Sequence, residues 1–147
     1  MNIILKNHEL VPCIEFLQSM ELPANNSRPV VKLTQLLSEA LSEVQDSQMT
    51  LIDQYGERNE AGELILTADQ SDYFIHPPKR ADYEAQATAL LNEEVVITGG
   101  PFVKVIERLP EVFANYDVKI SGKEALIYDR LLDEFEKGND GEASSTI

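Results

Sequence analysis

The sequence predicts an α+β fold that is mostly helical, with one long amphipathic helix packed against two or three shorter helices and a small sheet. Three observations support this class. Apolar residues recur at helical spacing over several long stretches, two short β-branched runs lie at 2–6 and 95–98, and 43% of the 147 residues are hydrophobic, enough to bury a core. We therefore expect a single globular domain over 1–137 and a flexible tail over 138–147.

The N-terminal segment predicts a strand followed by a helix. Residues 2–6, NIILK, form a short β-branched run bounded by polar residues, which is typical of a strand. Leu10, Ile14 and Leu17 then recur at helical spacing, which favours a helix from about 8 to 20. Pro12 fits this helix because the backbone N–H groups of a first turn have no helical acceptor.

The longest helix is expected over about 28–55, with Ser27 as its N-cap, Pro29 just inside it and Gly56 as its stop. Ser47 and Gln48 interrupt its apolar face, so the helix bends, breaks or meets a polar neighbour there. At about 100° per residue, one broad apolar sector collects Val30, Leu33, Leu36, Leu37, Ala40, Leu41, Val44, Leu51 and Tyr55. This sector serves a core or the seam of a homodimer, and we favour the core.

Four carboxylates form what we call the acidic stripe on the opposite side of this helix: Glu39, Glu43, Asp46 and Asp53. The apolar sector forces them into line, so a solvated back of an amphipathic helix explains their order. They are also the one candidate interaction face that the sequence offers, for a phage or host protein as partner.

The charge spacing of the acidic stripe limits it as a mimic of nucleic acid. Its four charges span about 21 Å at about 1.5 Å per residue, whereas each DNA strand carries about one charge per 3.4 Å. Mimicry therefore needs further carboxylates beside the stripe. The last helix could supply them from Asp129, Asp133 and Glu136.

The middle of the chain changes character after the long helix. Asn59–Gly62 is a turn signal, and ELILTA and DYFIH are short strand candidates, so 57–78 is expected to form a small hairpin or another ordered excursion. A helix follows over about 79–93, with an inward face of Tyr83, Ala87, Leu90 and Leu91. VVIT at 95–98 then predicts the second strand of the sheet.

The C-terminal third predicts a less regular stretch and then a clear helix. After Gly99 and Gly100 we expect an extended piece to about Arg108 and a short helix over 110–116, although the apolar spacing from Phe102 onward also fits a helix. Ser121 and Glu124 have the spacing of a capping box, and Gly138 is the predicted helix end. The apolar stripe of this helix comprises Ile127, Tyr128, Leu131, Leu132 and Phe135.

Composition and motifs argue against most chemistries. Twelve basic against 26 acidic residues give a net charge of −14, which disfavours direct binding of nucleic acid or anionic membranes. Cys13 lies on an apolar stripe and is expected to be a buried structural thiol, while His8 and His76 lack metal-ligand spacing and His76 is expected to shape a loop. We expect no catalytic residue, metal or cofactor, no signal peptide and no membrane span. A small enzyme that uses scattered carboxylates with a divalent ion stays as a minor alternative.

Four stretches carry a resemblance to a known family: the N-terminal strand, SRPVVKLTQLLSEALSEVQ, LLNEEVVITG and SGKEALIYDRLLDEFE. Together they resemble a family of small uncharacterised proteins from tailed bacteriophages and prophages of Gram-positive bacteria, over nearly the whole chain to Lys137. The resemblance implies a phage product in the host cytoplasm that takes part in virion morphogenesis or acts as an accessory protein. It transfers no residue role. We expect a non-enzymatic protein that works through protein contacts, or else an acidic inhibitor of a host nuclease or defence enzyme.

Overall fold

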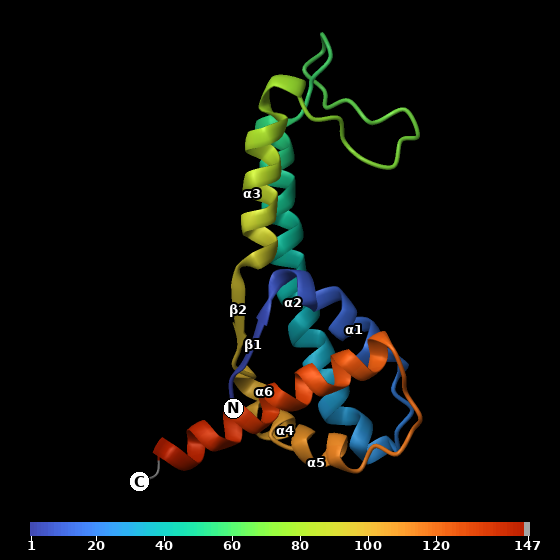
Figure 1. Cartoon of the computed structure of the whole chain (residues 1–147), viewed down its shortest axis with the longest axis vertical. Helices are drawn as coiled ribbons and strands as arrows, with labels where there is room; N and C mark the ends of the chain where they lie inside the picture. Colours follow the sequence, from blue (N-terminus) through green and yellow to red (C-terminus); the bar gives the residue numbers. More distant parts are fainter. Residues whose placement is uncertain (146–147) are drawn as a thin grey trace. The chain divides into compact units, whose positions relative to one another are not determined.

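The computed structural model describes the backbone of residues 1–145 and the side chains of residues 1–137. It divides into two compact units: unit 1 comprises Met1–Leu41 and Glu94–Ile147, and unit 2 comprises Ser42–Glu93. The helix α2 (Ala24–Tyr55), labelled in Figure 1, contributes its first part to unit 1 and its second part to unit 2. The mostly helical α+β class, the long helix and the small sheet are confirmed. A single domain over 1–137 stays a prediction, because the two units share α2.

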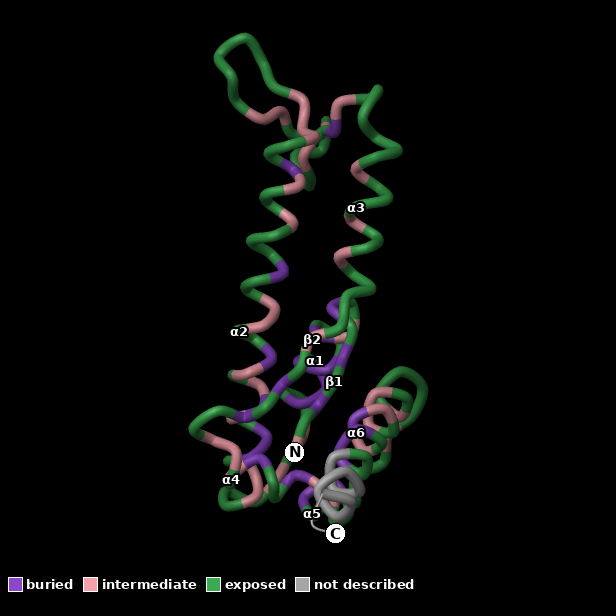
Figure 2. The backbone as a smooth tube through the Cα atoms, turned by 90° about the vertical axis from the view of Figure 1, so that its left-hand side faces the viewer, coloured by how far each residue is buried: buried purple, intermediate pink, exposed green. Residues whose placement is uncertain are grey.

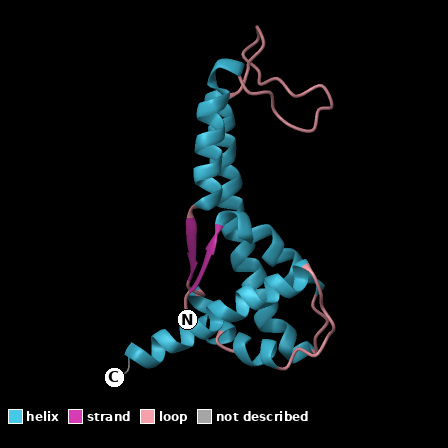
Figure 3. Cartoon of the chain, viewed as in Figure 1, coloured by secondary structure: helices cyan, strands magenta, loops and turns pink. Residues whose placement is uncertain are grey.

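Unit 1 contains the sheet, in which β1 (Ile3–Lys6) pairs antiparallel with β2 (Glu94–Ile97) (Figure 3). Ile3 lies opposite Ile97 and Leu5 lies opposite Val95. Side chains alternate along β1, so that Ile3 and Leu5 are completely buried while Ile4 and Lys6 face outward. The strands predicted at 2–6 and 95–98 are therefore confirmed, and they form one sheet.

The core of unit 1 is built by helices that pack on β1 and on one another. A short 3₁₀ turn, η1 (Asn7–Glu9), leads into α1 (Leu10–Ser19), which confirms the helix predicted over 8–20 and packs on α6. Leu33 and Leu37 of α2 are completely buried, which confirms the core role of this part of the apolar sector. Further completely buried residues are Leu10, Cys13, Ile106, Leu109, Phe113, Leu131 and Phe135.

The start of α2 differs from the prediction, because the helix begins at Ala24 rather than near residue 28 and Ser27 is not its N-cap. Ser27 lies within the first turn and its hydroxyl donates to the Ala24 carbonyl at 2.7 Å. Pro29, which is fully buried, has no N–H to offer the Asn25 carbonyl four residues earlier. The Arg108 guanidinium supplies the missing donor, with Nη2 at 3.0 Å from that carbonyl. A residue 83 positions away thus allows the helix to start earlier.

The apolar segment after β2 is helical rather than extended, so the predicted extended piece to Arg108 is wrong. It folds as η3 (Gly100–Phe102), α4 (Val103–Ile106) and α5 (Leu109–Ala114), the last of which confirms the short helix expected over 110–116. Gly99 has a φ of 86° and turns the chain so tightly that a Cβ there would lie 2.7 Å from Ile106 Cδ1. Helical folding buries Ile106 and Leu109 together, which is why the helical periodicity prevails.

The last helix, α6 (Lys123–Ser145), begins after Gly122, one residue later than a cap at Ser121 predicts. Its backbone continues past Gly138, so the predicted end at that glycine is wrong. The flexible tail expected over 138–147 lies in part outside the described residues, which include no side chain of this stretch. No helix in the described part of the chain combines the length and apolarity that a membrane crossing requires.

Unit 2 contains the second half of α2, the segment 56–76 and α3 (Arg80–Asn92), which follows the 3₁₀ turn η2 (Pro77–Lys79) and confirms the helix predicted over 79–93. Figure 2 shows α3 without a buried residue. Tyr83, Ala87 and Leu90 are half-buried as the inward face, but Leu91 is 36% exposed and does not belong to it. The Tyr83 ring packs edge-on against Tyr55 of α2, with centroids 6.2 Å apart.

The polar interruption in α2 lies beside a pocket. The helix runs without a break from Ala24 to Tyr55, which excludes a break at Ser47. Ser47 and Gln86 of α3 line the same pocket of about 290 Å³. Two polar side chains thus share the wall of a pocket where apolar residues would otherwise be expected.

Candidate functional site

The acidic stripe is exposed along α2. All four carboxylates belong to exposed residues, and Asp53 forms the one ion pair of the set, with Arg58 Nη2 at 3.5 Å. Glu39, Glu43 and Asp46 have no ion pair with any residue that the structure describes. In the structure of the chain alone, the acidic stripe is therefore a solvated helix face. An interaction role for the stripe stays a prediction.

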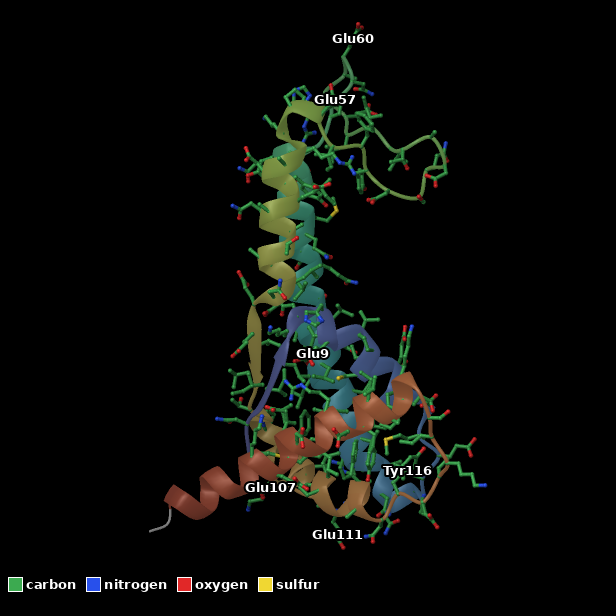
Figure 4. All side chains as sticks on the ribbon, in the orientation of Figure 1. Glu9, Glu57, Glu60, Glu107, Glu111 and Tyr116 are labelled. Carbon is green, nitrogen blue, oxygen red and sulfur yellow. The ribbon has the colours of Figure 1, made fainter. Side chains whose placement is uncertain are left out.

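An ion-pair network in unit 1 joins charged side chains of η1 and α6, and the sequence did not single it out. Arg130 of α6 donates from Nε to Glu9 Oε2 at 3.0 Å and from Nη1 to Glu134 Oε2 at 2.7 Å. Glu134 is only 4% exposed, and Lys137 Nζ lies 3.4 Å from its Oε2. Figure 4 shows Glu9 close to the start of α1. We call Glu9, Arg130 and Glu134 the edge network.

The edge network occupies the free edge of β1. The Ile4 N–H donates to Glu134 Oε1 at 2.9 Å, and Arg130 Nη2 donates to the Ile4 carbonyl at 2.9 Å. Alternate residues of an edge strand leave both backbone groups without a strand partner. Two side chains from α6 therefore bond the strand as a neighbouring strand would, and they fix the helix against the sheet.

The electrostatics of the edge network favour the charged forms of Glu134 and Arg130. Burial raises the pKa of Glu134, but the Ile4 N–H and the Arg130 guanidinium outweigh burial and leave that pKa below its ordinary value. Burial likewise lowers the pKa of Arg130, while Glu134 and Glu9 outweigh burial and raise it. The hydrogen bonds of this cluster link α6 to β1 and to Glu9, so the edge network has a structural role.

Cys13 is completely buried in α1, as the sequence predicted. Burial, reinforced by the Glu9 carboxylate and opposed by Arg130, raises the pKa of the Cys13 thiol to about 12. A thiol needs its thiolate form to act as a nucleophile. Cys13 therefore has a packing role.

We expect native protein at pH 8 to resist thiol reagents, because a pKa of about 12 makes the thiolate fraction about a thousandfold smaller than that of an ordinary cysteine. Iodoacetamide labelling followed by mass spectrometry measures this resistance. Unfolding in urea should restore labelling, and a Ser38→Cys variant provides an exposed thiol as control. Labelling of native Cys13 at the rate of the control would show that the thiol is accessible.

His76 shapes a loop, as the sequence suggested. His76 pairs through Nδ1 with the Glu57 carboxylate, and its backbone N–H donates to the Tyr55 carbonyl at 3.0 Å, so it closes the base of the 57–76 loops. His8 is exposed and lines a pocket of about 290 Å³ beside Glu9. In the part of the chain whose side chains are described, no three His, Cys, Asp or Glu side chains are placed to hold a metal ion together.

Comparison with known proteins assigns a family. Residues 1–142 match the model of a family described as Protein of unknown function (DUF1617). Neither the curated proteins nor the solved structures give a match. The family match spans the edge network and the whole of unit 2, so it includes every side chain discussed above. The chain therefore belongs to the DUF1617 family, which confirms the expected membership of a family without an assigned activity.

Proposed function

We propose that this protein works by binding another protein, without catalysing a reaction, as a phage product in the host cytoplasm. Its role on this proposal is in virion morphogenesis or as an accessory factor. The phage context is supported by the resemblance of its N-terminal strand, long helix, 90–99 segment and last helix to tailed-phage proteins. The binding role is supported by the surface of unit 2.

One observation carries the binding role: unit 2 exposes more large apolar side chains than it buries. Its buried apolar residues are Val44, Ile52 and Ile75. Its exposed ones are Met49 at 38%, Leu66 at 44%, Phe74 at 40% and Leu91 at 36%. Single exposed apolar residues are common on any protein. A unit with so small a core that also exposes aromatic and long aliphatic side chains is typical of a binding surface.

The charge of unit 2 narrows the kind of partner. It has 11 acidic and 3 basic side chains, a formal net charge of −8. Such a surface attracts basic surfaces and repels nucleic acid and further copies of itself. We therefore expect a different protein, with basic residues at its contact surface, as the partner.

A tagged capture from infected or prophage-induced cells tests the proposal. We expect a defined protein partner that is retained at both about 0.1 M and about 1 M salt, because apolar burial is not screened by salt. Nuclease treatment of the lysate is the control for indirect capture through nucleic acid. Capture of no protein at either salt concentration, or capture that nuclease abolishes, would contradict the proposal.

The alternative, an acidic inhibitor in the nucleic-acid site of a host nuclease or defence enzyme, is favoured by the unpaired carboxylates of Glu39, Glu43 and Asp46. It implies a basic partner that is lost at about 1 M salt, where the screening length falls to about 3 Å. It also implies loss of the partner on Glu43→Lys or Asp46→Lys. Retention of the partner by both variants at high salt would reject this alternative.

A further inference from the structure

Three segments of unit 2 meet in a closed ring of backbone hydrogen bonds. The Glu57 N–H donates to the Phe74 carbonyl at 2.8 Å, the Phe74 N–H donates to the Ile65 carbonyl at 2.8 Å, and the Ile65 N–H donates to the Glu57 carbonyl at 2.9 Å. Antiparallel bridges flank the ring on its three sides, between residues 56 and 75, 58 and 64, and 66 and 73. Two hairpins, over 58–64 and 66–73, thus meet the end of α2 and the start of η2 at one three-way junction. The small hairpin that the sequence predicted within 57–78 is part of this junction.

The ring places particular side chains on one face. Opposite residues of antiparallel segments project to the same side, and neighbours along a segment project to opposite sides. Glu57, Ile65 and Phe74 therefore share one side, and Asp72, two residues before Phe74, joins them. The ion pair between Glu57 and His76 agrees with this placement. We call Glu57, Ile65, Asp72 and Phe74 the junction face.

The junction face has an apolar centre with acidic flanks. Phe74 is 40% exposed and Ile65 is half-buried beside it. Asp72 is exposed and has no ion pair in the described residues, whereas the Glu57 carboxylate is held by His76. Figure 4 shows Glu57 where the long helix leads into the loops. An exposed aromatic ring between carboxylates is the composition of an interface anchor and its rim.

The loop beside the junction face is held in place before any partner binds. Asp69 accepts hydrogen bonds from the Thr67 hydroxyl at 2.6 Å, the Ser71 hydroxyl at 2.8 Å and the Ser71 N–H at 3.2 Å. The Thr67 N–H also donates to the Asp72 carbonyl at 2.8 Å. A contact surface that is already ordered loses less conformational entropy on binding than a flexible one.

We propose that the junction face is the docking surface for the partner protein, with Phe74 inserted into an apolar pocket that basic side chains surround. This inference rests on the proposed function and adds where the partner binds and what chemistry it presents. The apolar centre fits the pocket. The Asp72 carboxylate accepts a hydrogen bond from the Tyr73 N–H at 2.8 Å but forms no ion pair in the described residues, and together with the net charge of −8 on unit 2 it fits the basic rim. A second copy of the chain does not fit, because it would bring the same negative charge.

Site-specific crosslinking tests the docking surface. The full-length chain carries a benzophenone amino acid in place of Phe74, and a second version carries it in place of Leu126, which is 71% exposed on α6. Both are expressed in the cells used for the capture experiment and irradiated. We expect position 74 alone to crosslink, to a partner peptide that contains Lys or Arg beside apolar residues. Equal crosslinking at both positions, or crosslinking to an acidic peptide or to another copy of the chain, overturns the proposal.

Affinity measurements with the crosslinked partner complete the test. We expect Phe74→Ala to weaken binding about tenfold or more, and Asp72→Lys to weaken it most at low salt. Leu126→Ala and Glu15→Lys, at exposed positions of unit 1, are the matched controls and should bind as the wild type does. Circular dichroism confirms that each variant folds. If capture yields a partner whose affinity is unchanged by Phe74→Ala, the proposed function stands and the junction face is wrong; if no partner is captured, both fail.

Discussion

Replacing Phe113 with alanine is expected to lower the free energy of unfolding by about 3–5 kcal/mol. Phe113 is completely buried, and its ring packs edge-on against Phe135 with centroids 4.9 Å apart and stacks on Tyr128 at 5.2 Å. Phe16 adds a further edge contact at 6.3 Å. The substitution removes the ring that these three share and leaves a cavity, and a domain of this size is stable by only about 5–15 kcal/mol.

Urea denaturation followed by circular dichroism measures the loss, with Leu126→Ala as control. Leu126 is 71% exposed on α6, so its substitution should change the free energy of unfolding by less than about 0.5 kcal/mol. Phe113→Leu fills part of the cavity and should cost clearly less than Phe113→Ala. A Phe113→Ala chain as stable as the control would show that the aromatic cluster does not form the core of unit 1.

Replacing Arg130 with alanine is expected to destabilise the chain by about 3 kcal/mol, the lower end of the range for breaking a buried ion pair. The Arg130 side chain is 32% exposed, but that of Glu134 is only 6% exposed and would lose its guanidinium partner. The Ile4 carbonyl would lose its donor in the same step. Arg28→Ala, at an exposed position of α2 in unit 1, is the matched control and should change stability by less than about 0.5 kcal/mol.

The pH dependence of this loss identifies its cause. Because the pKa of Glu134 is lowered in the folded chain, its stabilising contribution is complete above its unfolded pKa of about 4.3 and is lost as the pH falls through the lower folded value. The stability difference between wild type and Arg130→Ala should therefore shrink between pH 5 and pH 3, since protonation removes the buried charge. A difference that stays constant over this range would assign the loss to the packing of the Arg130 stem instead.

Much of the fold could be predicted because the spacing of apolar residues along the chain indicates which side chains are buried. Leu33 and Leu37 in the long helix, and Leu131 and Phe135 in the last helix, were expected to face inward and are completely buried. Both strands of the sheet were also predicted, from their β-branched composition. The spacing of apolar residues was sufficient to predict burial wherever a residue packs into the core without needing one specific partner.

The features that the sequence did not predict depend on distant partners. Ser27 had the chemistry of a cap, but Arg108 supports an earlier helix start through the Asn25 carbonyl. Glu134 is one of 26 acidic residues, and local spacing does not predict its hydrogen bond with the Ile4 N–H, 130 positions away. In each case a single long-range hydrogen bond outweighs the local signal.

The candidate site was predictable only in part. Periodicity placed Glu39, Glu43, Asp46 and Asp53 on an outward face, and all four are exposed. The junction face was not foreseen, because local turn signals indicate a hairpin but not the return of Phe74 to Glu57 that closes the ring. Whether a partner occupies either surface depends on the partner's own chemistry, which this sequence does not contain.

The central claim is that this DUF1617 protein acts as one component of a complex with a different protein. The most direct measurement is the native mass of the tagged chain after gentle capture from infected or prophage-induced cells, with nuclease present throughout. We predict a complex whose mass exceeds the 16.5 kDa chain by that of a second, different protein in a fixed ratio. A mass equal to the chain alone, or to a multiple of it, would contradict the account.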